Sequence, residues 1–176
     1  APGQPVTLSG VVDDIHVSLR GGNDKLTING TPSGGVVPGS LSVRGSYGTN
    51  QILVQNLSVG NDLSIRTRGA ADEITVKATD VTEDLVIRSA AGADSVECSD
   101  VTVGASLDVH TGGGWYDDSV SIVDTVIGND LSCRSTRGDN EVIVGSTNVG
   151  SRTRVRLGNG ADRVQIGYHS PASLIA

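Results

Sequence analysis

Basic side chains recur along this chain at a nearly constant spacing, and they are the first candidates for chemistry. The set comprises Arg20, Arg44, Arg66, Arg88, His110, Arg134 and Arg156, in steps of 22 or 24 residues. Each member ends a short stretch in which apolar and polar residues alternate, as in Leu41-Ser42-Val43-Arg44. If these stretches stack as neighbouring strands, the basic groups form a column with about 4.8 Å between members.

Two interpretations of this basic column are open. Like charges this close repel, so the guanidinium groups could be paired with acidic residues that precede the same stretches. Those acidic residues are Asp62, Glu83, Asp84 and Asp130. Alternatively, the column is a straight row of cations that binds a polyanion, such as an acidic polysaccharide, or an acidic protein surface. The formal net charge of −7 disfavours nucleic acid as the partner.

A second column consists of acidic and amide residues in glycine-rich turns. Its acidic members are Asp24, Asp72, Asp94, Asp118 and Asp162, and the two remaining places hold Asn50 and Asn140. The first interpretation is that these side chains cap tight turns by bonding their own backbone. The second is a Ca²⁺ site, because carboxylates from adjacent turns are the hard oxygen ligands that Ca²⁺ prefers.

The turns that carry these residues resemble a known calcium-binding repeat. Gly60-Asn61-Asp62 and Gly158-Asn159-Gly160-Ala161-Asp162 resemble the glycine-aspartate repeats of RTX β-rolls, and this resemblance implies Ca²⁺ held between adjacent turns. The chain departs from the RTX pattern in its longer repeat of 22 residues and in its incomplete set of glycines.

One turn is longer than the others and carries aromatic residues. Residues 112–114 are three consecutive glycines, and Trp115 and Tyr116 follow them. The aromatic pair could stack on a sugar ring or anchor a protein contact. It could equally fold back over the body of the protein.

Signals for catalysis are few, and we expect no enzyme. The three histidines are scattered, and no motif typical of a serine hydrolase, zinc protease or phosphate-binding loop occurs. The expected architecture resembles right-handed β-helix polysaccharide lyases and hydrolases, in which long loops build a cleft. Here most turns are minimal, so no deep cleft can form, and Asp108 beside His110 is the only outward acid–histidine pair expected on that strand row.

An internal repeat positions all of these residues. Each repeat contains a stretch such as Leu63-Ser64-Ile65-Arg66, a second such as Asp72-Glu73-Ile74-Thr75-Val76, and a weaker third such as Thr79-Asp80-Val81. Alternation over three to five residues is strand periodicity with one buried face. Three short strands per 22 residues predict an all-β, parallel β-helix (β-solenoid) of about seven coils, because only stacked coils bury the apolar face. A β-sandwich is the rival fold, and parallel crossovers favour a right-handed coil.

The register also predicts which side chains form the core. Thr75 and Glu97 point outward, and the predicted inward residues are Ile74, Val76, Ile87, Val96 and Val109. Cys98 and Cys133 are inward as well, two coils apart, which is too far for a disulfide. We expect both to be buried free thiols.

Composition agrees with a secreted all-β domain. The chain has 176 residues, 24 of them Gly, with 2% aromatic residues and no Met, and no apolar run is long enough to span a membrane. The start without Met suggests removal of a signal peptide. We expect one domain over 1–176, with an N-terminal segment at 1–14, repeat coils at 15–167 and a C-terminal tail at 168–176.

The ends of the expected solenoid lack recognisable polar caps. The candidate contact residues are Val6 and Leu8 at one end and Val164, Ile166, Leu174 and Ile175 at the other. Uncapped strand edges predict contact with other copies, end to end, or a place within a longer solenoid. The predicted function is therefore a non-enzymatic structural protein, secreted or at the cell surface, that forms a filament or surface layer. This repeat style resembles β-helix segments of bacterial secreted and surface proteins. The alternative is a ligand-binding solenoid, for Ca²⁺ or acidic polysaccharide, that acts as an adhesin module.

Overall fold

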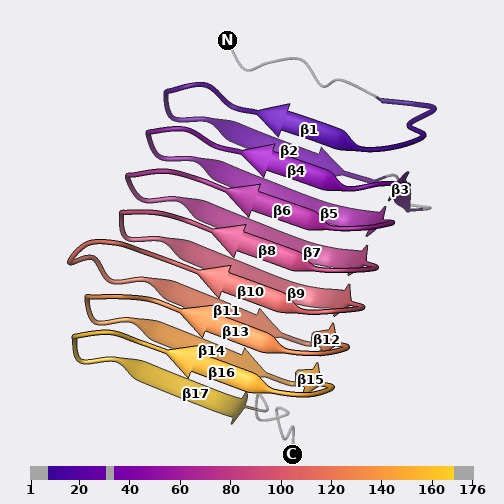
Figure 1. The fold of residues 1–176 in the computed structure, drawn as a ribbon. Coiled ribbons are helices and arrows are strands. Elements are labelled where there is room, and N and C mark those ends of the chain that lie inside the picture. Colours follow the sequence, from indigo (N-terminus) through magenta and orange to yellow (C-terminus); the bar gives the residue numbers. More distant parts are fainter. Residues whose placement is uncertain (1–7, 31–33, 169–176) are drawn as a thin grey trace, which may run out of the picture.

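A computed structural model describes residues 8–30 and 34–168, and every strand in this part of the chain pairs in parallel. Seven strands of four residues form the first sheet, with one strand from each coil (Figure 1). They are β1 (Ile15–Ser18), β4 (Leu41–Arg44), β6 (Leu63–Arg66), β8 (Leu85–Arg88), β10 (Leu107–His110), β13 (Leu131–Arg134) and β16 (Thr153–Arg156). The sheet order follows the chain, so each coil lies directly on the one before it.

A second, opposed sheet completes each coil. Its strands are β2 (Lys25–Asn29), β5 (Gln51–Val59), β7 (Glu73–Val81), β9 (Ser95–Val103), β11 (Ser119–Val123), β14 (Glu141–Gly145) and β17 (Arg163–Tyr168). Three short strands pair with the later part of the long strands or with one another. They are β3 (Gly35–Val37), β12 (Val126–Ile127) and β15 (Asn148–Val149). The protein is thus an all-β solenoid of about seven turns, as the repeat predicts.

The third strand of each repeat is separated from the second by a sharp corner. One residue per corner has a left-handed backbone, and these are Asn56, Ala78, Asp100, Asp124 and Ser146, with φ between 44° and 55°. In β5, β7 and β9 the pairing continues through the corner, so the second and third predicted strands form one bent strand there. In later coils the same corner separates β11 from β12 and β14 from β15.

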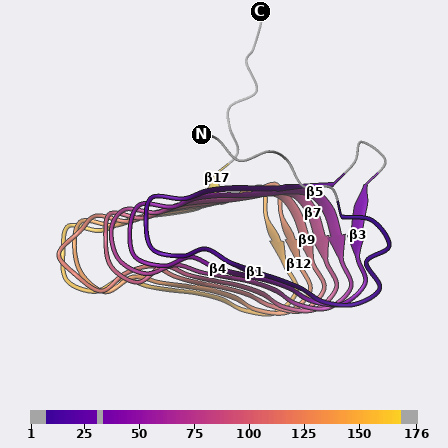
Figure 2. The ribbon, with the colours of Figure 1, turned by 90° about the horizontal axis from the view of Figure 1, so that it is seen from above.

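The solenoid is flattened and right-handed. Seen from above, the coils lie over one another and the two sheets face each other across a narrow interior (Figure 2). In Figure 1 the near sheet runs from right to left and the far sheet from left to right while the chain descends. This is the hand favoured for parallel crossovers.

Apolar columns fill the interior, and the predicted inward-facing side chains are confirmed. Leu41, Leu63, Leu85, Leu107 and Leu131 follow one another in the first sheet, each fully buried. The inward set is confirmed in full, with exposures of at most 1% for Ile74, Val76, Ile87, Val96 and Val109. Glu97 is exposed and Thr75 half-buried. Both cysteines are buried and free.

The register of the first coil differs from the prediction. The sequence stretch 17–20 was expected to align with Leu41–Arg44, but the strand is β1, and Ser18 is the partner of Arg44. A shift of two residues leaves the same side chains facing inward, so alternation alone cannot distinguish the two registers. Arg20 therefore lies beyond the strand and does not belong to the basic column.

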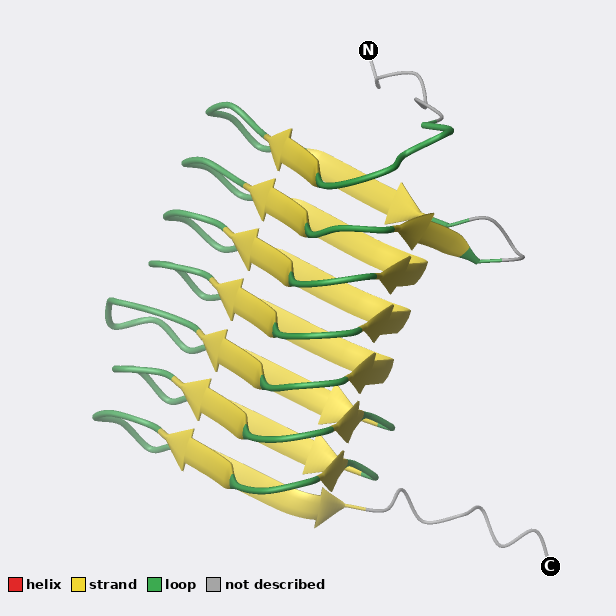
Figure 3. Cartoon of the chain, turned by 45° about the vertical axis from the view of Figure 1, so that its right-hand side comes forward, coloured by secondary structure: helices red, strands yellow, loops and turns green. Residues whose placement is uncertain are grey.

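The connections differ between the two edges of the solenoid. One edge carries similar short turns, and the longest of them joins β10 to β11 (Figure 3). Residues 30–40 form an insertion that contains β3, which pairs with β5 and buries Val37. Residues 31–33 of that insertion lie outside the described part.

Candidate functional site

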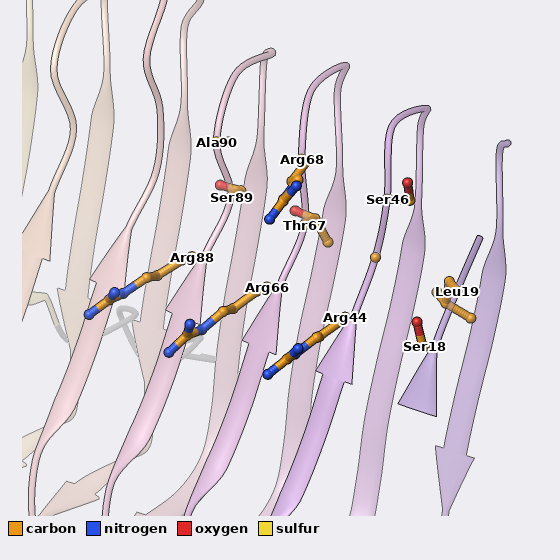
Figure 4. Close-up of a pocket in the computed structure, with 11 residues that line it drawn as sticks. Ser18, Leu19, Arg44, Ser46, Arg66, Thr67, Arg68, Arg88, Ser89 and Ala90 are labelled. Atoms are coloured by element: carbon orange, nitrogen blue, oxygen red, sulfur yellow. The ribbon is translucent and has the colours of Figure 1, made fainter. Parts of the chain in front are cut away.

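The basic column is an observed feature of the first sheet. Register pairing places Arg44 beside Arg66, Arg66 beside Arg88, and His110 between Arg88 and Arg134. Arg156 follows Arg134 at the far end. Figure 4 shows the side chains of Arg44, Arg66 and Arg88 extended in parallel from the ends of adjacent strands.

The expected carboxylate partners do not neutralise this column. In the described residues its only ion pair joins Arg88 Nη2 to Asp108 Oδ2 at 3.7 Å, with both side chains partly exposed. Asp62 and Asp84 instead accept backbone N–H groups of the following coil, at 3.1 and 2.9 Å. Asp130 accepts the N–H of Arg152 in the same way. These carboxylates precede the arginines by four residues, roughly 13 Å along a strand, so they are too far away to pair.

A groove of about 460 Å³ lies between the basic column and the adjoining turns. Its cationic lining is Arg44, Arg66, Arg88 and Arg68, and no acidic residue lines it. Ser46 and Thr67 contribute hydroxyl groups (Figure 4). The Thr67 Oγ1 atom is buried and has no hydrogen-bond partner within the described chain. The groove therefore concentrates positive charge on a protein whose net charge is negative.

The acidic and amide column forms a continuous hydrogen-bonded ladder between coils. The Oδ1 atom of Asp72 accepts the backbone N–H of Asn50 at 2.8 Å, and Asp94 accepts that of Asp72 at 2.9 Å. Asp118, Asn140 and Asp162 continue the series at 3.0–3.1 Å. The carboxylates of Asp72, Asp94, Asp118 and Asp162 therefore bond the preceding coil rather than their own turn. The prediction of turn capping is confirmed for Asn50 and Asn140, whose amides donate to backbone carbonyls of their own turns. In all, the ladder connects five pairs of coils.

The ladder buries carboxyl groups close to one another. Burial raises the pKa of Asp94 to about 6, while the hydrogen bond that it accepts from the N–H of Asp72 lowers it. The charges of Asp118 and Asp72 raise it further. In the described residues no three His, Cys, Asp or Glu side chains gather closely enough to hold a metal ion. Ca²⁺ binding stays a prediction, which melting curves with Ca²⁺ or EDTA would test.

The aromatic loop is exposed, as one of its two interpretations requires. Trp115 is 73% exposed and Tyr116 56%. The guanidinium carbon of Arg137 lies 4.9 Å from the centre of the Trp115 ring, which is a cation–π contact. Sequence reasoning missed Tyr47, which is 69% exposed on the same row of turns. Its position three residues after Arg44 is the signal that could have indicated it.

Both ends of the described solenoid expose strand edges and apolar side chains. At the first end, β1 and β2 are outer strands, and Leu8 is 63% exposed. At the other end, β16 and β17 are outer strands, with Val164 47% and Ile166 59% exposed. Their equivalents one coil earlier, Val142 and Val144, are buried. Val6, Leu174 and Ile175 lie outside the described residues.

Comparisons with protein-family models, curated proteins and solved structures find no match to this chain. Among the described residues no helix could cross a membrane.

Proposed function

We propose that this chain is a non-enzymatic, extracellular building block that stacks end to end with other copies into a filament or surface layer. The observation that carries the proposal is the complementarity of the two solenoid ends. Placing β16 and β17 of one copy against β1 and β2 of the next continues both parallel sheets by the same step that joins coils within the chain.

Apolar side chains match across such a junction. Continuation of the register brings Val155 over Val17, Val164 over Leu26 and Ile166 over Ile28. All six are only partly buried or exposed at the free ends. Burying them would gain about 25 cal/mol for each Å² of apolar surface removed from water.

Polar groups match as well. The backbone N–H of Asp162 has no partner in the described chain, and at the other end no described residue donates to the Oδ1 atom of Asp24, the atom that accepts in the later steps of the ladder. In a stacked pair, Asp24 of the next copy would accept the N–H of Asp162 and extend the ladder by one step. Arg152 would stand beside Asp14 of the next copy, because both belong to one position of the repeat. The exception is Arg163 over Lys25, and Glu141, at 3.3 Å from Arg163, offsets that repulsion.

Burial raises the pKa of Cys98 and Cys133 to about 12, so neither thiol is a nucleophile at neutral pH. This supports a non-enzymatic role. The resemblance of the repeat style to secreted and surface β-helix segments supports a place outside the cell.

The test is assembly of the 176-residue chain measured by light scattering and negative-stain microscopy over a range of concentrations. We expect rods that lengthen as concentration rises. Ile166→Lys should abolish them, because it places a charge in the apolar junction. Val126→Lys is the matched control, since Val126 is 48% exposed on the side of the solenoid, away from both ends. A parent that stays monomeric, or an Ile166→Lys variant that assembles like the parent, would refute the proposal.

A further inference from the structure

We propose that the groove beside Arg44, Arg66 and Arg88 binds a linear acidic polysaccharide along the solenoid axis. The guanidinium groups of Arg44 and Arg66 form no ion pair or hydrogen bond with other described residues, and Arg88 shares only the exposed contact with Asp108. Three cations at steps of about 4.8 Å repel one another unless anions lie between them. A polymer with anionic groups at regular intervals supplies such anions in one extended molecule.

The groove offers contacts for both parts of a charged sugar. Guanidinium groups bind carboxylate or sulfate through paired N–H donors. The half-buried Ser46 at the groove offers a hydroxyl that can exchange hydrogen bonds with sugar hydroxyls. Arg68 adds a fourth cation at the edge of the turns.

Exposed aromatic rings flank the groove along the same row of turns. The ring of Tyr47 lies against Gly69, where a Cβ atom would be 3.3 Å from the Tyr47 Cδ1 atom, so glycine leaves room for it there. Trp115 stands three coils further on, roughly 14 Å along the axis. Flat aromatic faces pack well against the apolar face of a sugar ring. This combination favours an acidic glycan as the occupant over an acidic protein surface.

Nucleic acid also carries regular anions and stacks on aromatic rings, but the rest of the molecule opposes it. The chain has a net charge of −7, and an acidic protein repels a polyphosphate outside the one basic groove. A comparison with single-stranded DNA therefore belongs in the test.

The experiment is titration calorimetry with polygalacturonate as the carboxylated probe and heparin as the sulfated probe. Dextran is the neutral control and single-stranded DNA the competitor. We expect one or both acidic glycans to bind and dextran not to bind. Raising the salt concentration should weaken binding, because the arginines displace the counterions of the glycan. Binding of one probe alone would identify the anionic group.

The decisive variant is Arg44→Gln with Arg66→Gln, which removes two exposed cations. We expect at least a tenfold loss of affinity and a shallower salt dependence. The matched control is Arg134→Gln with Arg156→Gln, in the same column but outside the groove. Tyr47→Ala should weaken binding without changing the salt dependence. No binding of either acidic glycan, equal loss in the two double variants, or tighter binding of DNA would overturn the proposal. Measurements below the concentration at which rods form keep this result independent of the proposed assembly.

Discussion

Asp94 shows how one position of the repeat can be filled at different energetic cost. The ladder needs an oxygen at each step to accept the N–H of the preceding coil, and aspartate and asparagine both provide it. The second oxygen of Asp94 is buried without a partner, whereas the amide of Asn140 donates to the carbonyls of Arg137 and Gly138 and its oxygen accepts the N–H of Asp118. Asparagine therefore satisfies the turn more completely than a buried carboxylate does.

We therefore predict that Asp94→Asn stabilises the protein at neutral pH. Gly92, two residues earlier, has a positive φ, as Gly138 has before Asn140, so the turn can accept the amide. The pKa of Asp94 is raised from 3.8 to about 6 in the folded state, so folding favours the protonated form. The carboxylate thus destabilises the fold above pH 6, and this penalty disappears as the pH falls towards 3.8.

Urea unfolding at several pH values would measure this effect. The gain in unfolding free energy of Asp94→Asn should be present at pH 7 and absent near pH 4. Ser95→Asn, at the exposed next position, serves as the control and should show no such pH dependence. A gain that is equal at both pH values would argue against a raised pKa.

The core position Val96 tests the register directly. It is 1% exposed and faces the interior between Ile74 and Val120. Val96→Asp should unfold the domain, because an unpaired buried charge destabilises by several kcal/mol. Circular dichroism would detect the loss of strand signal. Glu97→Asp on the outward face is the control, and a Val96→Asp variant as stable as the parent would disprove the register.

At the scale of the elements, the corner between the second and third strands holds a left-handed non-glycine residue in five of the described coils. Asparagine and aspartate tolerate this backbone, but Ala78 adopts it with φ of 44°. A left-handed alanine is strained by roughly 1–2 kcal/mol, and glycine is not. Glycine loses more conformational entropy on folding, which offsets part of the gain.

We predict that Ala78→Gly raises the unfolding free energy by about 0.5–1 kcal/mol in urea titrations. Ala105→Gly provides the comparison, because Ala105 has no positive φ and glycine there should destabilise slightly. If both substitutions destabilise by the same amount, the strain at the corner is absent.

Alternation and repeat length were sufficient to predict these elements, but not their interactions between coils. The 22-residue period predicts the stacked strands, since Leu63, Leu85 and Leu107 can share a column only in a solenoid. The position of β1 could not be predicted, because a shift of two residues keeps the same faces. The ladder could not be predicted either. Whether the carboxylate of Asp72 or Asp94 accepts an N–H of its own turn or of the preceding coil depends on how closely the turns stack. The groove depends on that geometry too, so Arg68 and Tyr47 were not singled out.

At the scale of the whole molecule, end-to-end stacking and glycan binding use different surfaces. End-to-end stacking uses the terminal coils, whereas the arginine groove lies on the side of coils two to four and stays open in a stack. Stacking would repeat the groove along the filament once per chain, at intervals of roughly 34 Å for seven coils. A long glycan could then occupy several grooves at once.

This arrangement predicts that assembly strengthens the binding of long acidic glycans but not of short ones. Once one groove holds a polymer, the next groove meets it at a high effective concentration, so affinity can rise by two orders of magnitude or more without new contacts. Calorimetry under assembling conditions should therefore show tighter binding, per groove, of long polygalacturonate than of a short oligomer. Ile166→Lys should bind the short oligomer like the parent and lose the additional affinity for the long polymer. Val126→Lys should retain both. Equal affinity for long and short glycans in the assembled parent would show that the grooves are not aligned along a common axis, and the stacking geometry would then be wrong.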